Sequence, residues 1–210
     1  MKGLFSRFLP LFAVLAALLG IGGESLAQTR VAEVVAIKGA AFITSGGRTQ
    51  PAALGSAVLQ GDQIHAPTAS GVKLRFTDGA TMSLGENSLI TVHTYTQQGN
   101  SRTAIFEMLN GIFRAVVSPL TGDSVFAVRT PTAVAAVRST DWMLATRADL
   151  TEVFVGEGAV AVRNLNPAVR NEVVLTPGDG TDVRVDAAPI GPVKWGPPRI
   201  RSFTERTTVE

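Results

Sequence analysis

The sequence predicts an all-β protein, built as a β-solenoid-like stack of short strands and hairpins. Short segments alternate between apolar and polar residues with the period of two that half-buried strands show. The 210 residues include 21 glycines and 11 prolines, as expected where many strands are joined by turns. Glycine-kinked strands at Gly39, Gly111 and Gly158 share a local pattern that lets successive coils pack together. Their spacing is irregular, so a two-sheet β-sandwich is the alternative.

Composition excludes several kinds of chemistry. With no cysteine, the chain has no disulfide framework, no thiolate zinc site and no cysteine nucleophile. A formal net charge of +2 does not provide the clustered basic surface that a nucleic-acid backbone requires, so we expect no nucleic-acid partner. The sequence also contains no GxSxG elbow, phosphate-cradling loop or HExxH zinc motif. No cofactor is therefore expected.

The amino-terminal segment predicts export. Lys2 and Arg7 precede an apolar run over residues 8–21, and Ser25-Leu26-Ala27 forms a small-x-small cleavage pattern. We therefore expect a signal peptide over residues 1–27 and a periplasmic or secreted mature chain. The alternative is an uncleaved anchor, but the apolar run is shorter than the ~20 residues of a spanning helix. No later run reaches that length, so no transmembrane helix is expected in the mature chain.

Residues 28–188 are expected to form one β domain. The clearest pair of strands spans Val72 to Leu84, where Asp78-Gly79 provides the positive φ of a tight hairpin turn. Residues 105–117 are ambiguous, but Gly111 and the β-branched and aromatic residues after it favour strands on both sides of a turn. Further strands are expected within residues 31–44, 57–66, 81–95, 126–129, 152–163, 172–175 and 183–185.

The composition shifts towards proline and glycine from residue 189, and we expect a carboxy-terminal tail over residues 189–210. Trp195 is expected to dock on the domain, followed by an extended segment that frays. The alternative is a basic interaction tail that uses Arg199, Arg201 and Arg206.

The chain is organised around the stretch FAVRTPTAVAAVRSTDW, from Phe126 to Trp142. Phe126 and Val128 share one face of a strand, while Ala127 and Arg129 share the other. Proline cannot donate into a β-ladder, so this strand ends or becomes an edge at Thr130-Pro131. The candidate structural or functional motif comprises Thr130, Pro131, Arg138, Thr140, Asp141 and Trp142.

The order of the motifs resembles the FecR domain family, the periplasmic part of iron-dicitrate-type signalling regulators. The resemblance covers about residues 33–185. It rests on Gly61-Asp62-x-Ile64, Leu74-x-Phe76-x-Asp78-Gly79, Leu84 with Ser88, Leu109-x-Gly111-x-Phe113, Phe126-x-Val128-x-Thr130-Pro131-Thr132-Ala133, Val137-Arg138-Ser139-Thr140-x-Trp142 and Glu157-Gly158-x-Val160. It implies a β-rich, solenoid-like domain that senses signals or binds proteins rather than catalysing a reaction.

Two features depart from the pattern of that family. Its members usually carry glycine between the arginine and the threonine of the central motif, where this chain has Ser139. Membrane-bound members also carry a cytoplasmic anti-sigma segment and a transmembrane helix before this domain, where this chain has the expected export signal. The resemblance therefore implies the domain but not the control of a sigma factor.

Few residues are candidates for catalysis or for binding a ligand. His65 and His93 lack metal-ligand spacing, and we expect both to lie on strand surfaces. The segment 179–182, DGTD, resembles part of a calcium loop but lacks the distal glutamate, so a plain turn is expected. Arg138 and Asp141 lie between apolar neighbours, where charge is costly unless it is paired. A structural staple is the favoured role of this pair, and a ligand site is the alternative.

The function expected from the sequence is that of an exported, non-enzymatic sensing or protein-binding module in envelope signalling. Its partner would be an envelope or membrane protein that contacts one face of the β-stack. The alternative is a structural or glycan-binding envelope protein, with Trp195, Tyr95 and Trp142 as platforms for sugar rings. A third hypothesis, an enzyme that uses His65 or His93, has no partner residues to support it.

Overall fold

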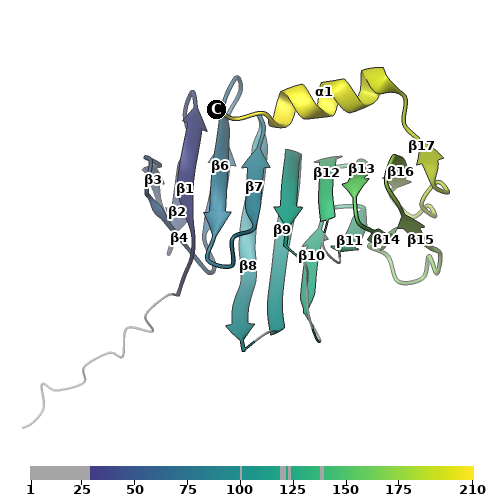
Figure 1. Ribbon diagram of the computed structural model, residues 1–210, viewed down its shortest axis with the longest axis horizontal. Helices are drawn as coiled ribbons and strands as arrows, with labels where there is room; N and C mark the ends of the chain where they lie inside the picture. The colour runs from purple at the N-terminus through teal and green to yellow at the C-terminus, as the bar shows by residue number, and fades with distance from the viewer. Residues whose placement is uncertain (1–28, 100, 119–121, 123, 138–139) are drawn as a thin grey trace, which may run out of the picture.

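The computed structural model describes residues 29–99, 101–118, 122, 124–137 and 140–210, which form seventeen strands and one helix. Strands make up most of this part of the chain (Figure 1), which confirms the all-β prediction. The expected signal peptide, residues 1–27, lies outside the described residues. Within the described residues, no helical segment has the length and hydropathy needed to span a bilayer.

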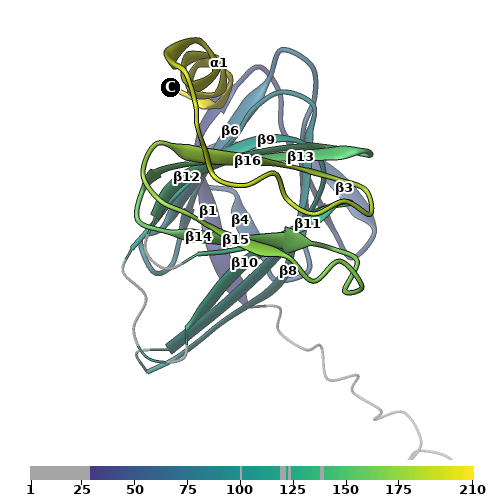
Figure 2. The same ribbon diagram turned by 90° about the vertical axis from the view of Figure 1, so that its right-hand side faces the viewer.

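The strands are arranged in two facing layers (Figure 2). Layer A contains, in spatial order, β4 (Ala57–Leu59), β1 (Arg30–Lys38), β6 (Gly71–Phe76), β7 (Thr81–Leu84), the second half of β9 (Ser101–Val117), β12 (Thr140–Arg147), β13 (Leu150–Glu157), β16 (Asp179–Arg184) and β17 (Val193–Lys194). Layer B contains β3 (Arg48–Pro51), β2 (Phe42–Ser45), β5 (Gln63–Ala66), β8 (Ser88–Gln98), the first half of β9, β10 (Val125–Arg129), β11 (Ala133–Val137), β14 (Val160–Asn164) and β15 (Glu172–Leu175).

Strand β9 belongs to both layers, so the seventeen strands form one continuous hydrogen-bonded network. Residues up to Asn110 pair with β8 and β10 in layer B, whereas residues from Gly111 pair with β7 and β12 in layer A. Gly111 has a φ of +107°, which residues with a Cβ rarely adopt. The expectation of a turn at Gly111 was therefore wrong, because this glycine bends one continuous strand from one layer into the other.

The chain alternates between the layers along its length. β1 lies in layer A, β2 and β3 in layer B, β4 in layer A and β5 in layer B, and the later strands continue this alternation. Gly39 and Gly158 have positive φ values of +66° and +81° and lie at two of these crossings. The successive passes resemble the coils of a solenoid, while the facing layers fit the sandwich alternative. Neither layer closes on itself.

The inner faces of the layers form one apolar core. The predicted hairpin is confirmed as β6 and β7, with Gly79 in the turn at a φ of +85°. The rings of Phe113 and Trp142 form a T-shaped pair, with their centroids 4.9 Å apart. The largest fully buried side chains include Trp142, Phe106, Phe113, Phe126, Ile64 and Leu74.

A buried ion pair also joins the layers. Arg102, in the layer B half of β9, pairs with Asp78 in the β6–β7 turn, and their side chains are only 7% and 9% exposed. Burial lowers the pKa of Arg102. Its guanidinium lies 5.8 Å from the centre of the Phe126 ring. Because a buried charge without its partner is costly, this pair fixes the β6–β7 turn against β9.

The carboxy-terminal segment differs from the extended tail that the sequence suggested. α1 (Pro197–Thr207) is a helix that lies on the outer side of layer A (Figures 1 and 2). Prolines occupy its first turn, where the missing N–H groups are tolerated. Trp195 docks as expected, against Phe154 and Phe203. Val209 is buried after the helix, so the expectation of a fraying end was wrong.

Replacing Gly111 by alanine should destabilise the fold. A Cβ at this position would collide with Ser88, at a φ that strains any residue other than glycine. We expect the free energy of unfolding, measured by urea denaturation, to fall by about 2–5 kcal/mol. Gly47→Ala is the matched control, because Gly47 has a φ of +79° but open space around it. That control should cost only about 1–2 kcal/mol, and equal losses would contradict close packing at the bend.

Candidate functional site

Thr130 and Pro131 lie in the turn between β10 and β11, in layer B. The Thr130 hydroxyl donates to the carbonyl of Ala133 at 3.1 Å, and the Ala133 amide donates to that hydroxyl at 2.9 Å. Thr130 is buried, and Pro131 is half-buried. The Thr130 hydroxyl therefore closes the turn from within.

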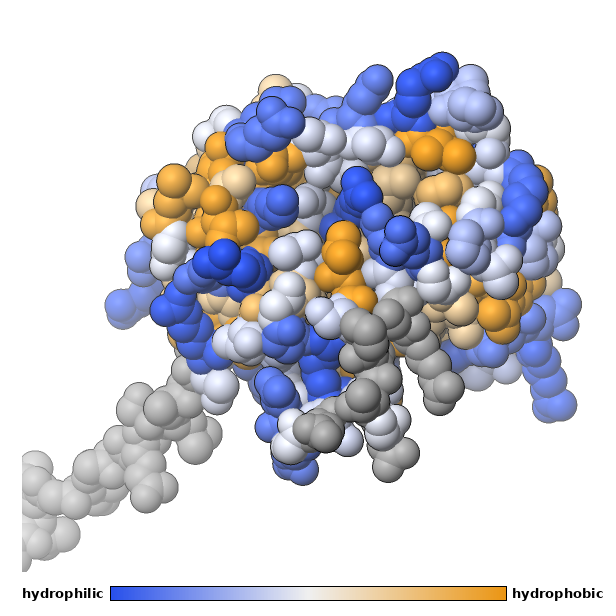
Figure 3. All heavy atoms as spheres, viewed as in Figure 1, coloured by the Kyte–Doolittle hydropathy of each residue, from blue (hydrophilic) through white to orange (hydrophobic). Residues whose placement is uncertain are grey.

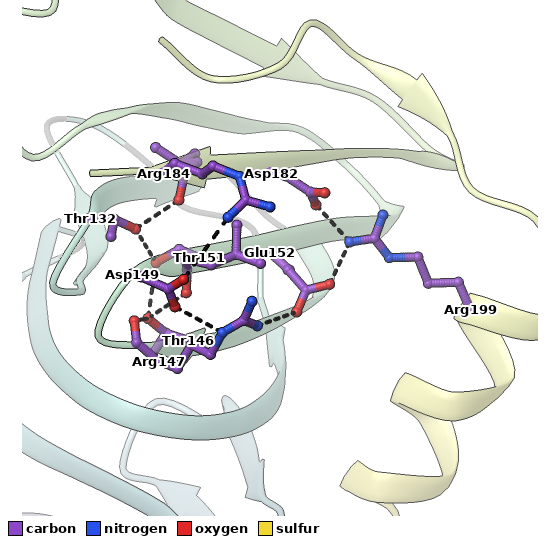
Figure 4. A network of polar contacts seen from close by, with 11 residues as sticks. Thr132, Thr146, Arg147, Asp149, Thr151, Glu152, Asp182, Arg184 and Arg199 are labelled. Carbon is purple, nitrogen blue, oxygen red and sulfur yellow. Dashed lines mark hydrogen bonds and ion pairs between the residues drawn. The ribbon is translucent and has the colours of Figure 1, made fainter. Parts of the chain in front are cut away.

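Buried threonine hydroxyls connect this turn to layer A. Thr151 of β13 lies at the centre of the group, beside Thr132 and Thr146 (Figure 4). Its Oγ1 is 2.7 Å from those of Thr130 and Thr132 and 2.9 Å from that of Thr146. The Thr132 hydroxyl also lies 3.0 Å from the carbonyl oxygen of Val183. These hydroxyls satisfy one another's hydrogen-bonding capacity in the interior. They form a structural connection between the layers.

Thr140, Asp141 and Trp142 lie at the opposite end of β11, where β12 begins. Trp142 is fully buried, and neither its indole nitrogen nor the Thr140 hydroxyl has a hydrogen-bond partner among the described residues. Arg138 lies outside the described residues, and so does its expected pairing with Asp141. The run of β12 from Thr140 to Thr146, where the threonine group lies, is roughly 20 Å long. The structure therefore does not bring the two halves of the motif into one site.

Asp141 is paired with Arg114 of the adjacent strand, β9. The Arg114 Nε donates to one carboxylate oxygen at 2.8 Å, and Nη2 donates to the other at 2.5 Å. This bidentate hydrogen bonding raises the pKa of Arg114. The contact links the neighbouring strands β9 and β12 within layer A. Asp141 therefore does pair with an arginine, but that arginine is Arg114, 27 residues earlier in the sequence.

Arg199 fastens α1 to layer A. Its Nη2 donates to Glu152 of β13 at 2.5 Å and to Asp182 of β16 at 2.6 Å (Figure 4). Its guanidinium also lies 3.7 Å from the centre of the Trp195 ring. These contacts belong to a ladder of alternating charges whose members are Arg184, Asp149, Arg147, Glu152, Arg199 and Asp182.

Within the part of the chain that the structure describes, the two histidines lie apart from any cluster of carboxylates. His65 of β5 and His93 of β8 are both exposed, and the His65 ring stacks on Phe42 with centroids 6.2 Å apart. No group of three or more histidine or carboxylate side chains within the described part of the chain could hold a metal ion.

Residues 179–182 form the first part of β16, directly after a turn at Pro177 and Gly178, so the expectation of a plain turn at 179–182 was wrong. The Asp179 carboxylate accepts hydrogen bonds from the amide of Thr176 at 3.0 Å and from its hydroxyl at 2.6 Å. It also pairs with Lys194 of β17 at 2.8 Å. The hydrogen bond from Lys194, together with those from Thr176, lowers the pKa of Asp179 to about 2. The carboxylate is therefore committed to holding β17 in place.

The two layers differ in what covers their outer faces. α1 and Trp195 cover layer A, where the buried cluster comprises Ile112, Met143, Ala145, Phe154, Trp195 and Phe203. Within the described residues, no helix covers layer B (Figure 2). On the face of the molecule that is seen in Figure 1, apolar residues form separate patches among polar ones (Figure 3).

The uncovered outer side of strands β9, β10, β11, β14 and β15, here termed the open face, is apolar along its middle. Five side chains lie in register across these strands: Ile105, Ala127, Ala136, Ala161 and Val174. Val174 is 56% exposed and Val125 is 43% exposed. A shallow groove of about 270 Å³ crosses this area, lined by Val125, Ala136, Ala159, Ala161 and Val174 among others.

A charged row borders the apolar row. The next register contains Glu107, Arg129, Val134, Arg163 and Glu172. Arg129 and Arg163 are exposed, and neither forms an ion pair with a described residue. The only hydrogen bond of the Arg163 side chain there is a long one, 3.4 Å, to the carbonyl of Asn164. Apolar surface with arginine at its border is typical of protein interfaces.

The open face was not identified as a site from the sequence. The alternation around Phe126 correctly placed Ala127 and Arg129 together on the opposite side of the strand. Only the register between strands brings Ala161 and Val174 beside them, and no local motif encodes that register.

The aromatic platforms suggested for glycan binding are not available on the surface. Trp195 is 7% exposed, Tyr95 is 3% exposed and Trp142 is fully buried. Tyr95 stacks on Phe76, with ring centroids 5.1 Å apart. None of the three rings therefore offers a face to a sugar, and that part of the alternative hypothesis was wrong.

Part of the chain matches the model of a known family. Residues 62–161 match the model of the family described as FecR protein. No curated protein matches the chain. Two crystal structures of a candidate anti-sigma factor from Parabacteroides distasonis have a similar fold, each with a TM-score of 0.55, 17% identity and 68% of this chain covered. The chain spans 64% and 63% of the length of those two structures, and at this identity the likeness concerns the fold alone.

Arg199→Met should loosen α1. The change removes two charge-assisted hydrogen bonds and the cation over Trp195. We expect a loss of about 1–3 kcal/mol in the free energy of unfolding and a red shift of tryptophan emission as Trp195 gains solvent. Arg201→Met is the matched control, because Arg201 is exposed on the same helix. If both variants keep the parent's emission maximum, Arg199 does not hold the helix.

The stability of the protein should fall in acid partly through Asp179. Its pKa, about 2, lies below the ~3.9 of an unfolded aspartate, so its contribution is present above about pH 4 and is lost as the pH falls towards 2. Asp179→Asn should lower the melting temperature at neutral pH and flatten the decline between about pH 4 and 2. Asp149→Asn is the control, because that side chain is 62% exposed. An unchanged acid slope in Asp179→Asn would contradict this assignment.

Proposed function

We propose that this protein is an exported, non-enzymatic sensing or protein-binding module in envelope signalling, because its residues 62–161 match the FecR family model. Proteins of the FecR family and anti-sigma factors are regulatory proteins rather than enzymes, and this supports a signalling role. The module binds an envelope or membrane protein and passes on the state of that partner.

The open face is the single observation that carries the binding role. It joins five strands and exposes valine side chains that no part of the described chain covers. Its border row holds two arginines and two glutamates that form no ion pair with a described residue. Exposed apolar surface is costly in water unless a partner covers it. The equivalent face of layer A is already covered by α1.

Export is the second part of the proposal. It rests on the basic, apolar and small-x-small pattern of residues 1–27. Export would place the open face outside the cytoplasm, where envelope proteins are accessible to it.

The binding role can be tested by capture from the envelope fraction of cells that produce the tagged full chain. Val174→Glu places a charge in the apolar row and should reduce capture of the partner about tenfold or more. Val185→Glu is the matched control, because Val185 is 53% exposed against 56% for Val174 and lies outside the open face. The control should capture the partner as the parent does, and both variants should keep the parent's melting temperature.

Three outcomes would contradict the proposal. Equal capture by Val174→Glu and the parent would remove the open face as the binding surface. Retention on peptidoglycan without any protein partner would favour the structural or glycan-binding alternative. Recovery of the full-length chain in the cytosol alone would remove the export component.

A further inference from the structure

The direction and length of the apolar row on the open face indicate what shape of partner segment fits it. The apolar row runs perpendicular to the strands, from Ile105 on β9 to Val174 on β15. Four spacings between neighbouring strands make it roughly 19 Å long. A helix laid along the row covers that length with about 13 residues.

Layer A shows how this protein covers such a face. α1 lies on the outer side of its strands, with Phe203 packed on the apolar floor and Arg199 paired with Glu152 and Asp182 at the border. Layer B also has an apolar floor, made by Ala127, Ala136 and Ala161. On its border, Arg129 and Arg163 lie in the middle of the row, Glu107 and Glu172 lie at its two ends, and none of the four forms an ion pair with a described residue.

We propose that the open face docks an amphipathic helix of the partner protein, whose carboxylates pair with Arg129 and Arg163. This inference rests on the proposed function. Arg129 and Arg163 are two strands apart, with Val134 between them, which is a separation of about 9.6 Å. Carboxylates seven residues apart on a helix are separated by about 10.5 Å along its axis, so both can be paired at once.

Charge argues against two other occupants. On the helix α1 of a second copy, the exposed charged side chains are Arg201, Glu205 and Arg206, whose net charge has the same sign as Arg129 and Arg163. A second open face related by a twofold axis parallel to the strands would bring Arg129 against Arg163 and Glu107 against Glu172. Like charges placed opposite one another disfavour both arrangements.

The probe for this site is a stapled helical peptide of about 14 residues, with leucines on one stripe and two glutamates seven positions apart on the bordering stripe. It is titrated into the full chain carrying ¹³C-labelled alanine methyl groups. We expect shifts at Ala127, Ala136 and Ala161, and affinity about tenfold or more above that of a peptide with lysines in place of the glutamates.

Charge reversal on the protein completes the test. The double variant Arg129→Glu, Arg163→Glu should prefer the lysine peptide, whereas Arg201→Glu on α1 should keep the preference of the parent. Equal affinity for both peptides, or shifts confined to other alanines, would overturn the proposal. Dimerisation that Val174→Glu abolishes would make a second copy the occupant and would also overturn it.

The two proposals can fail separately. If capture of the envelope partner is lost in Val174→Glu but unchanged in the Arg129 and Arg163 double variant, the binding role stands and the acidic helix is excluded. If capture is equal in all variants, the open face is not the binding surface and both proposals fall.

Discussion

The architecture depends on one backbone conformation, the bend of β9 at Gly111. The first half of this strand sets the position of β8 and β10, and its second half sets that of β7 and β12. The bend therefore fixes the register of both layers at once and aligns their inner faces. The buried pair of Arg102 and Asp78 restrains the same strand near its other end. The apolar core between the layers follows from this alignment.

Each layer has an apolar strip with charged residues at its border on its outer face, but only the strip on layer A is covered by a described helix. On layer A, an apolar floor and acidic border groups are covered within the chain by α1 and Arg199. On layer B, a floor of alanine and valine has a border of two arginines and two glutamates, and no helix covers it within the described residues. Because α1 covers layer A, the open face of layer B is the broad sheet surface that the described chain leaves accessible to a partner.

The features predicted from the sequence are those encoded locally. Alternation and Asp78-Gly79 correctly predicted the all-β class and the β6–β7 hairpin. The sequence predicts a turn at Gly111 because glycine between two apolar segments is typical of turns, whereas the continuation of one strand into two layers depends on pairing with four other strands. α1 was missed because proline in a first helical turn resembles a proline-rich tail. The open face and the Asp141–Arg114 pair depend on register between distant strands, which no short motif specifies.

The unclosed ends of the layers have a consequence for self-assembly. Each layer terminates on a strand of two to four residues: β4 and β17 in layer A, and β3 and β15 in layer B. Such short edges expose few free backbone groups, and β3 ends on Pro51, which has no amide hydrogen to donate. A strand from another molecule would find few backbone groups to pair with at these edges, so the two layers resist growth into fibres.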